Sequence, residues 1–411
     1  MKIAVIGGGF TGLAAAYTLT KRHHKVTLFE AGPVLGGLAY GFKEKNWDWS
    51  LESSYHHWFT NDRAVLNLIK ELGLEKKLII KRPVTANLYR GKTYQLDSPL
   101  SLLRFPLLPL ADKLRTAALL AFLKITPFWK PLENLTAEQL LTSIGGSRAY
   151  QVLWEPLLVG KFGNFAPNVQ AAWFWARIQK RTPRLMYMEG GFKTLIDALE
   201  SAIKKQGGKI IKNNSPCPPS LRSGAGRREF SIQNVKFDKA LLTIPQAQVP
   251  PIPHLWAQTL ILETKEPILK NVYWLNITDR SFPFLAAVAH TNFMDKKYYG
   301  NHHLTYFGNY LPANHPYLSM TKEQLLKKFL PFIQRLCPST IYDLRSYLFT
   351  APFAQPVHEL HYSSRAPKLE TSVPNVFLAN MDSIVPWDRG VNYAIELGQK
   401  AASLINKYGS K

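Results

Sequence analysis

The chain opens with Lys2-Ile-Ala-Val-Ile-Gly7-Gly8-Gly9-Phe10-Thr11-Gly12, an apolar run that continues directly into the pattern G-x-G-x-x-G. The apolar run predicts a short buried strand, and the small residues 13–19 predict a helix after it. Gly7 permits the tight turn, Gly9 lets a phosphate approach the backbone, and Gly12 lets the helix pack close to the sheet. The free N–H groups and partial positive charge at the helix start, around Phe10 and Thr11, favour a diphosphate. The stretch therefore predicts a dinucleotide-binding βαβ unit.

A second strand with an acidic end follows this helix. It reads Lys25-Val-Thr-Leu-Phe-Glu30, and Glu30 stands 18 positions after Gly12. Dinucleotide-binding domains place a carboxylate at about this distance, where it accepts hydrogen bonds from the ribose hydroxyls. We therefore expect Glu30, with the adjoining Ala31, to contact an adenosine ribose. A glycine-rich turn of purely structural value is the alternative.

A second glycine pair, Gly36-Gly37, follows the acidic strand end and precedes Leu38. An NAD-binding domain has no need of this pair. It resembles the GG element of flavoproteins in the amine oxidase, phytoene desaturase and protoporphyrinogen oxidase superfamily, in which arginine usually occupies the place of Leu38. The chain is similar over nearly its whole length to the bacterial protoporphyrinogen oxidase-like NAD(P)/FAD-dependent oxidoreductases. The resemblance implies non-covalently bound FAD, with Gly36, Gly37 and Leu38 among its contacts.

The C-terminal residues resemble the same superfamily. Residues 375–379 predict a buried strand, and residues 386–394 lead into a helix. In the superfamily such a loop and helix N-terminus close over the flavin, where the helix dipole favours the negative charge of the reduced pyrimidine. An Asp usually stands two places after the strand, and here the acid comes one position later. The implied cofactor contacts are Trp387, Gly390, Val391 and Asp382.

The segments between these ends alternate between two expected domains. A turn at Gly190-Gly191, a helix and a strand near residue 210 resemble the unit that returns the chain to the FAD domain, with a backbone contact to adenine around Cys217. We therefore predict an α/β fold: a Rossmann-like FAD/NAD(P)-binding domain with an interleaved α+β substrate domain of mixed sheet plus helices. FAD-binding parts are expected at residues 1–75, 186–250 and 351–411, a helical substrate lobe at 76–185 and its mixed sheet at 251–350. Helices are expected at residues 64–72, 112–123, 139–158, 171–179 and 322–336.

Few side chains are needed for catalysis, because flavin performs the redox step and the protein positions the substrate and excludes water. His56 and His57 follow the GG element, and histidine can act as acid or base near neutral pH. The alternative is that both pack among the neighbouring aromatic residues. Lys161 is a third catalytic candidate, since a lysine near the flavin recurs in related amine oxidases. A surface lysine is the alternative for that position.

Two further features concern the substrate and metals. Trp173, Trp175 and Arg177 share a predicted helix, where they favour either an apolar, anionic substrate or core packing with a snorkelling arginine. His302 and His303 have no acid or cysteine at ligand spacing, so no metal is predicted.

The composition is strongly basic, with 51 Lys and Arg against 28 Asp and Glu, a net charge of +23. This favours an anionic partner, namely a phospholipid surface, nucleic acid or a phosphorylated substrate, or it marks a lineage of basic proteins. No regular interleaving of basic and aromatic residues is present, so nucleic acid is not an expected partner. Residues 100–128 are apolar with interspersed charges, which predicts a substrate tunnel, a membrane-facing surface, or helices packed on their own lobe.

The location follows from the cysteines and the N-terminus. The chain has two cysteines and no CxxC motif, which fits a reducing compartment. No signal-peptide pattern and no uncharged run of membrane-spanning length is present. We therefore expect a cytoplasmic protein, with peripheral contact at the inner membrane surface as a further possibility.

Three functions are compatible with these features. The first is an FAD-dependent oxidase or desaturase that removes a hydride from a largely apolar small molecule at flavin N5. The second is a redox-neutral flavin mutase resembling UDP-galactopyranose mutase, for which the basic charge suits a nucleotide sugar. The third is a non-catalytic flavin-binding protein of the membrane surface.

Overall fold

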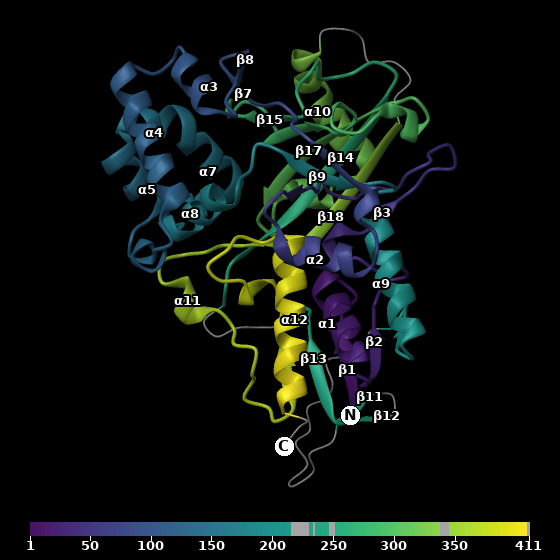
Figure 1. Cartoon of the computed structure of the whole chain (residues 1–411). Coiled ribbons are helices and arrows are strands. Elements are labelled where there is room, and N and C mark those ends of the chain that lie inside the picture. Colours follow the sequence, from purple (N-terminus) through teal and green to yellow (C-terminus); the bar gives the residue numbers. More distant parts are fainter. Residues whose placement is uncertain (215–229, 233–234, 246–250, 338–344, 409–411) are drawn as a thin grey trace.

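The computed structural model describes residues 1–214, 230–232, 235–245, 251–337 and 345–408. These residues form a five-stranded parallel sheet with flanking helices, a larger mixed sheet and a separate group of helices beside it (Figure 1). The five-stranded sheet corresponds to the expected nucleotide-binding domain and is called the nucleotide-binding sheet. Cys217 lies outside the described residues, so the adenine contact around it stays a prediction.

Five parallel strands form the nucleotide-binding sheet. Their order is β10 (Lys209–Ile211), β2 (Lys25–Phe29), β1 (Lys2–Ile6), β13 (Lys239–Leu242) and β19 (Val376–Leu378). All four pairings are parallel, and Ile3 of β1 lies opposite Val26 on one side and Lys239 on the other. Parallel strands are covered on both faces, which explains why β1 and β13 are nearly continuous apolar runs. This arrangement confirms the predicted Rossmann-like domain.

Helix α1 (Phe10–Lys21) lies between α12 (Val391–Lys407) and α9 (Lys193–Lys205), and α2 (Arg63–Glu71) packs across α12 (Figure 1). The contact between α1 and α12 is close because Gly398 of α12 has no side chain. A Cβ atom there would lie 2.2 Å from the carbonyl oxygen of Thr11. The two ends of the sequence therefore share one core.

The larger sheet has seven strands. Their order is β18 (Arg345–Pro356), β14 (His254–Thr264), β17 (His303–Leu311), β16 (Ala286–Ala289), β15 (Trp274–Ile277), β7 (Thr85–Tyr89) and β8 (Lys92–Gln95). Only β15 and β7 pair in parallel, so the sheet is mixed, as predicted. Helix α10 (Lys322–Leu336) covers one face, where Phe329 packs with Leu260 and Phe307.

A group of helices stands beside this sheet. It contains α3 (Pro99–Arg104), α4 (Leu110–Ile125), α5 (Ala137–Leu140), α6 (Ser147–Ala149), α7 (Glu155–Phe162) and α8 (Ala171–Lys180). The single helix expected at residues 139–158 is wrong. Two π-helical turns, Leu141–Gly145 and Tyr150–Trp154, interrupt it, and Gly146 has a φ of +101° that a helix cannot contain. We call residues 99–180 the helical lobe.

Several smaller elements complete the fold. A three-stranded sheet has the order β5 (Trp58–Phe59), β9 (Leu185–Met188) and β6 (Leu78–Lys81). Two strand pairs are β3 (Gly41–Phe42) with β4 (Leu51–Glu52) and β11 (Phe230–Ile232) with β12 (Val235–Phe237), and the remaining helix is α11 (Tyr362–Arg365). The large sheet contains β7 and β8 from before the expected segment limit at residue 185 and five strands from after it. Its strand β18 extends across the other expected limit, at residue 350. The expected limits of the five chain segments stay a prediction. None of the helices in the described residues is both long and apolar enough to cross a bilayer.

Candidate functional site

The turn between β1 and α1 has a conformation that only glycine provides. Gly7 has a φ of +107°, and a Cβ atom on Gly12 would lie 1.9 Å from the carbonyl oxygen of Gly7. Gly9, by contrast, has an ordinary extended conformation, with φ −72° and ψ 177°, and is the residue that precedes α1. The space beside Gly9 is open, since the nearest atom to a Cβ there is 3.8 Å away. The backbone at the start of α1 is therefore accessible to a ligand.

The glycine pair after β2 lies against this turn. The amide of Gly36 donates to the carbonyl oxygen of Gly8 at 2.9 Å, and Gly9 and Gly36 form a bridge. A Cβ atom on Gly37 would lie 3.1 Å from the Cα of Gly9. The two glycine turns thus form a cradle of bare backbone next to a helix N-terminus, in which Gly37 is exposed and Gly9 partly exposed, and such a cradle fits a diphosphate.

Glu30 stabilises the turn between β1 and α1. Its carboxylate accepts hydrogen bonds from the amides of Gly8 at 2.7 Å and Gly32 at 2.8 Å. Two carboxylate oxygens offer about four acceptor positions, so the side chain retains capacity for ribose hydroxyls. Ala31 lies exposed beside it. The roles of both residues toward a ribose remain predictions.

The residues expected near the flavin occupy the start of α12. Gly390 precedes α12 and Val391 begins it, and both line a cavity. Trp387 stacks on Tyr393, with ring centroids 5.7 Å apart, and on Trp175 at 5.1 Å. Trp387 thus fixes the loop before α12 against the helical lobe.

Asp382 takes a different position. It is buried, and its carboxylate lies 2.6 Å from Nε2 of His254, while its backbone amide donates to the side chain of Asn380. Among the described residues Asp382 is thus held by protein groups, and it does not line the cavity.

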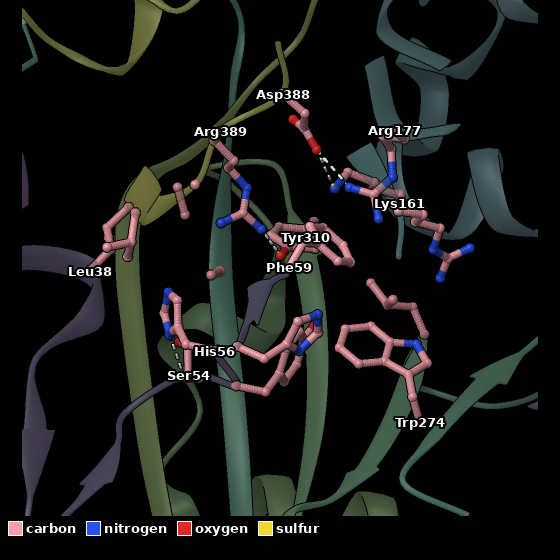
Figure 2. A pocket seen from close by; sticks show the side chains of 18 of the residues that line it. Leu38, Ser54, His56, Phe59, Lys161, Arg177, Trp274, Tyr310, Asp388 and Arg389 are labelled. Atoms are coloured by element: carbon pink, nitrogen blue, oxygen red, sulfur yellow. Dashed lines mark hydrogen bonds and ion pairs between the residues drawn. The ribbon is translucent and has the colours of Figure 1, made fainter. Parts of the chain in front are cut away.

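The cavity has a volume of about 300 Å³ and lies between the helical lobe, the large sheet and the start of α12 (Figure 2). Leu38, Gly390 and Val391, which are expected to contact the cofactor, border it on one side. The opposite walls are largely apolar and aromatic, and they include Trp154, Leu157, Leu158, Trp173, Phe174, Ile178 and Trp274. A mostly apolar hollow with a few polar groups is the usual form of a small-molecule site.

Both histidine candidates line this cavity. Nδ1 of His56 donates to the carbonyl oxygen of Ser54 at 2.7 Å (Figure 2), and Nδ1 of His57 lies 3.1 Å from the hydroxyl of Tyr273. Burial is the main cause that lowers the pKa of His56 to about 4 and the pKa of His57 to about 3. Both rings are therefore neutral at pH 7, where they can accept a hydrogen bond but are too weakly basic to hold a proton.

Lys161 also lines the cavity, which excludes the surface alternative for it: its side chain is 12% exposed. The ammonium lies 4.8 Å from the ring centre of Tyr310 and 3.9 Å from the carboxylate of Asp388. Burial lowers the pKa of Lys161 well below its ordinary value, although Asp388 acts in the opposite direction. Asp388 in turn accepts a hydrogen bond from Arg177 at 2.6 Å (Figure 2), and the charges of Lys161 and Arg177 hold the pKa of Asp388 well below its ordinary value.

Four charged residues of the cavity were not singled out from the sequence. Asp388 and Arg389 stand directly before Gly390, the residue that precedes α12, while Arg181 follows α8 and Asp62 precedes α2. Arg389 donates through Nε to Gln355 at 2.7 Å and hydrogen-bonds to the Tyr310 hydroxyl. The sequence did contain a signal for Asp388 and Arg389. They directly precede Gly390, which was expected near the flavin, so their side chains could have been expected in the same site.

The described residues contain no group of three or more His, Cys, Asp or Glu side chains that would hold a metal ion. The polar groups of the cavity are basic side chains, two carboxylates, hydroxyls, amides and neutral histidines, which suit an organic ligand.

Several solved structures have the same overall fold as this chain. The structure superposes on a putative protoporphyrinogen oxidase from Exiguobacterium sp. 255-15 with a TM-score of 0.77, 19% identity and coverage of 99% of both chains. It superposes on reduced UDP-galactopyranose mutase with a TM-score of 0.76 and 14% identity, over 100% of this chain and 96% of that one. At these identities the likeness concerns the fold.

In sequence, the chain is 26% identical over 184 residues to zeta-carotene desaturase of Solanum lycopersicum, which is 38% of this chain and 30% of the desaturase. The chain thus matches under a third of that relative's length. The model of the family described as flavin-containing amine oxidoreductase matches residues 10–406. The chain therefore belongs to the flavin-containing amine oxidoreductase family.

Proposed function

We propose that the chain binds FAD non-covalently and oxidises a largely apolar small molecule, as an oxidase or desaturase. One observation carries the proposal: the cavity joins the expected cofactor contacts Leu38, Gly390 and Val391 to apolar walls supplied by the helical lobe. When bound there, FAD supplies a hydride acceptor at its N5 atom.

The chain's own groups would hold the cofactor at both ends. Amides at the start of α1, with the cradle of Gly9 and Gly37, would bind the diphosphate. The carboxylate of Glu30 would accept from the ribose. The N-terminus of α12, at Gly390 and Val391, would place its partial positive charge beside the flavin.

Proton transfer would fall to a buried base of the cavity. Oxidation of a C–H or N–H group removes a hydride and leaves a proton on the substrate. The lowered pKa of Lys161 makes its Nζ atom a better proton acceptor than that of an ordinary lysine. The rings of His56 and His57, with pKa values of about 4 and 3, are too weakly basic to hold this proton at neutral pH and would instead accept hydrogen bonds. The aromatic walls exclude water from the reacting atoms.

The cations of the cavity favour a second candidate, a redox-neutral mutase that acts on a nucleotide sugar. The structural likeness to UDP-galactopyranose mutase supports it, as do Arg177 and Arg389, two arginines that line the same cavity. A non-catalytic flavin-binding protein of the membrane surface is the third candidate.

The first experiment is to purify the protein, record its visible spectrum and release the nucleotide by heat. About one FAD per chain in the supernatant supports the proposal, and a colourless protein that takes up no added FAD contradicts it. The holoprotein is then photoreduced and exposed to oxygen or a quinone. Rapid reoxidation supports an oxidase or desaturase. Reduced flavin that stays reduced favours the mutase.

We also propose that the helical lobe contacts an anionic lipid surface. Within the described residues, many of the exposed large apolar side chains lie between residues 100 and 128: Leu100, Leu103, Leu110, Leu114, Phe122, Ile125 and Phe128. On α4, Leu110, Leu114, Phe122 and Ile125 share the outward face, while Leu119 and Leu123 of the same helix are buried.

A helix with a second, outward apolar face fits an interfacial position. The exposed Arg104 beside this face and the net charge of +23 complement anionic headgroups.

A further inference from the structure

The inward face of α8 alternates apolar and cationic side chains. Phe174, Arg177 and Ile178 of α8 line the cavity, together with Arg181 directly after the last residue of this helix. Their spacing of three or four residues follows one side of the helix. Apolar residues alone would serve a hydrocarbon. Two guanidinium groups within the same surface require an additional explanation.

The charges around the cavity do not balance. Three arginines line it, namely Arg177, Arg181 and Arg389, against the two carboxylates Asp62 and Asp388, while burial lowers the pKa of the remaining basic group, Lys161. Asp62 is directed away to the backbone amide of Phe59, to which it is hydrogen-bonded at 2.9 Å. Asp388 alone therefore serves the cations, and the cavity carries an excess of positive charge.

The cations differ in how they are held. Arg177 binds Asp388, and Arg389 is fixed by Gln355 and Tyr310. The guanidinium of Arg181 forms no hydrogen bond or ion pair with any described residue, and the residue is exposed. Arg181 follows the last residue of α8, and the charge of Arg177 acts on it unfavourably, so the two arginines gain from an anion placed between them.

We propose that Arg177 and Arg181 form an oxyanion-binding subsite, which selects a substrate with a carboxylate or phosphate group on an apolar body. The planar guanidinium donates two parallel hydrogen bonds to either group. Phe174, Ile178 and the facing Trp154 contact the apolar body. The same excess of positive charge disfavours protonated amines. This inference rests on the proposed function, because it takes the cavity as the substrate site.

The test measures binding by calorimetry to the FAD-loaded protein. Three probes share one ring system and differ in charge: 1-naphthylacetate, 1-naphthylacetamide and 2-(1-naphthyl)ethylamine. We expect the carboxylate to bind at least about tenfold more tightly than the amide, and the amine more weakly than either. A fourth probe, 1-naphthyl phosphate, distinguishes phosphate from carboxylate recognition.

The variant Arg181→Gln should reduce carboxylate affinity about tenfold and leave amide affinity unchanged. Arg184→Gln is the matched control, because Arg184 is exposed, close in sequence and absent from the cavity wall. Arg181→Lys, which retains the charge, should restore part of the affinity.

Several outcomes overturn the proposal: equal affinity for carboxylate and amide, no binding of any probe at millimolar concentration, or equal effects of Arg181→Gln and Arg184→Gln. A protein that takes up no FAD contradicts the proposed function instead. The same titration of FAD-free protein then still tests the subsite, so the two failures are distinguishable.

Discussion

Asp388 accepts a hydrogen bond from Arg177 at 2.6 Å, and this contact joins the loop before α12 to helix α8 of the helical lobe. The same carboxylate lies 3.9 Å from the ammonium of Lys161. One buried side chain therefore connects the expected cofactor side of the cavity to its substrate side and neutralises part of the charge between them.

Replacing Asp388 by Asn should lower the free energy of unfolding by about 1–3 kcal/mol, because two cations lose their shared counter-charge. The effect is smaller than for a fully buried pair, since Arg177 is 41% exposed. Urea denaturation measures it. Glu155→Gln removes a surface partner of Arg280 and should cost less than about 1 kcal/mol. If both variants lose the same free energy of unfolding, Asp388 contributes no more to stability than an exposed ion pair.

Gly9→Val tests the cofactor cradle without straining the fold. The φ and ψ angles of Gly9 are open to any residue, but a side chain there would fill the space beside Gly37. We expect at least about tenfold weaker FAD binding with an unchanged melting temperature of the FAD-free protein. Flavin fluorescence titration measures the affinity. Unaltered FAD affinity would place the diphosphate elsewhere.

Gly398→Ala should destabilise the chain by about 1–3 kcal/mol, because the added methyl group would lie 2.2 Å from the carbonyl oxygen of Thr11 and force α12 away from α1. Gly160→Ala is the control within another helix. Its Cβ atom would lie 3.7 Å from Leu285, an ordinary contact, so stability should stay equal or rise by about 0.5–1 kcal/mol. Thermal unfolding compares the two, and a tolerated Gly398→Ala would exclude the close contact.

Glu52 should make stability fall as the pH rises. It is fully buried, accepts hydrogen bonds from Tyr187 and the amide of Phe192, and burial raises its pKa to about 7. A carboxyl with a raised folded-state pKa favours the protonated native state, so its contribution is present below pH 4.5 and is lost as the pH passes 7.

Glu52→Gln mimics the protonated carboxyl. Its stability relative to the wild type should therefore increase between pH 5 and pH 8, measured by urea denaturation. Glu189→Gln, at an exposed position, controls for the loss of charge. A difference from the wild type that does not change with pH would argue against the raised pKa.

Ile125→Asp should reduce binding to vesicles of phosphatidylcholine with phosphatidylglycerol about tenfold, because Ile125 is 79% exposed on the outward face of α4. Ile80→Asp introduces the same change at a 51% exposed position of β6, outside the helical lobe. Sedimentation with vesicles compares both with the wild type. Equal binding of all three proteins would remove the helical lobe as the lipid contact.

The sequence predicted best those features that depend on local geometry. Gly7 and Gly12 can be recognised because a strand-helix turn next to a phosphate site requires glycine at fixed spacing. The strands of the parallel sheet can be recognised as short apolar runs. The break at Gly146 was missed, because apolar spacing continues through π-helical turns much as it does through an α-helix.

The charged part of the cavity could not be predicted in this way. Arg181 and Arg389 have ordinary sequence surroundings, and they face one cavity only because α8 and the start of α12 are brought together by the tertiary fold. For the same reason, the sequence alone could not exclude that Lys161 is a surface lysine. The burial of a residue, and its ion pairs with residues far away in the sequence, depend on tertiary packing. A single sequence does not reveal this packing.

The order of strands in the nucleotide-binding sheet has a consequence for synthesis on the ribosome. β1 pairs with β13, and β13 pairs with β19, so the neighbours of the first strand lie near residues 240 and 377. Pairing across such separations is slow, and it requires that the distant strands have left the exit tunnel. The N-terminal glycine motif is therefore made first, but its sheet is completed last. A chain that stops before β19 has every residue of the motif and lacks the folded site in which the motif acts.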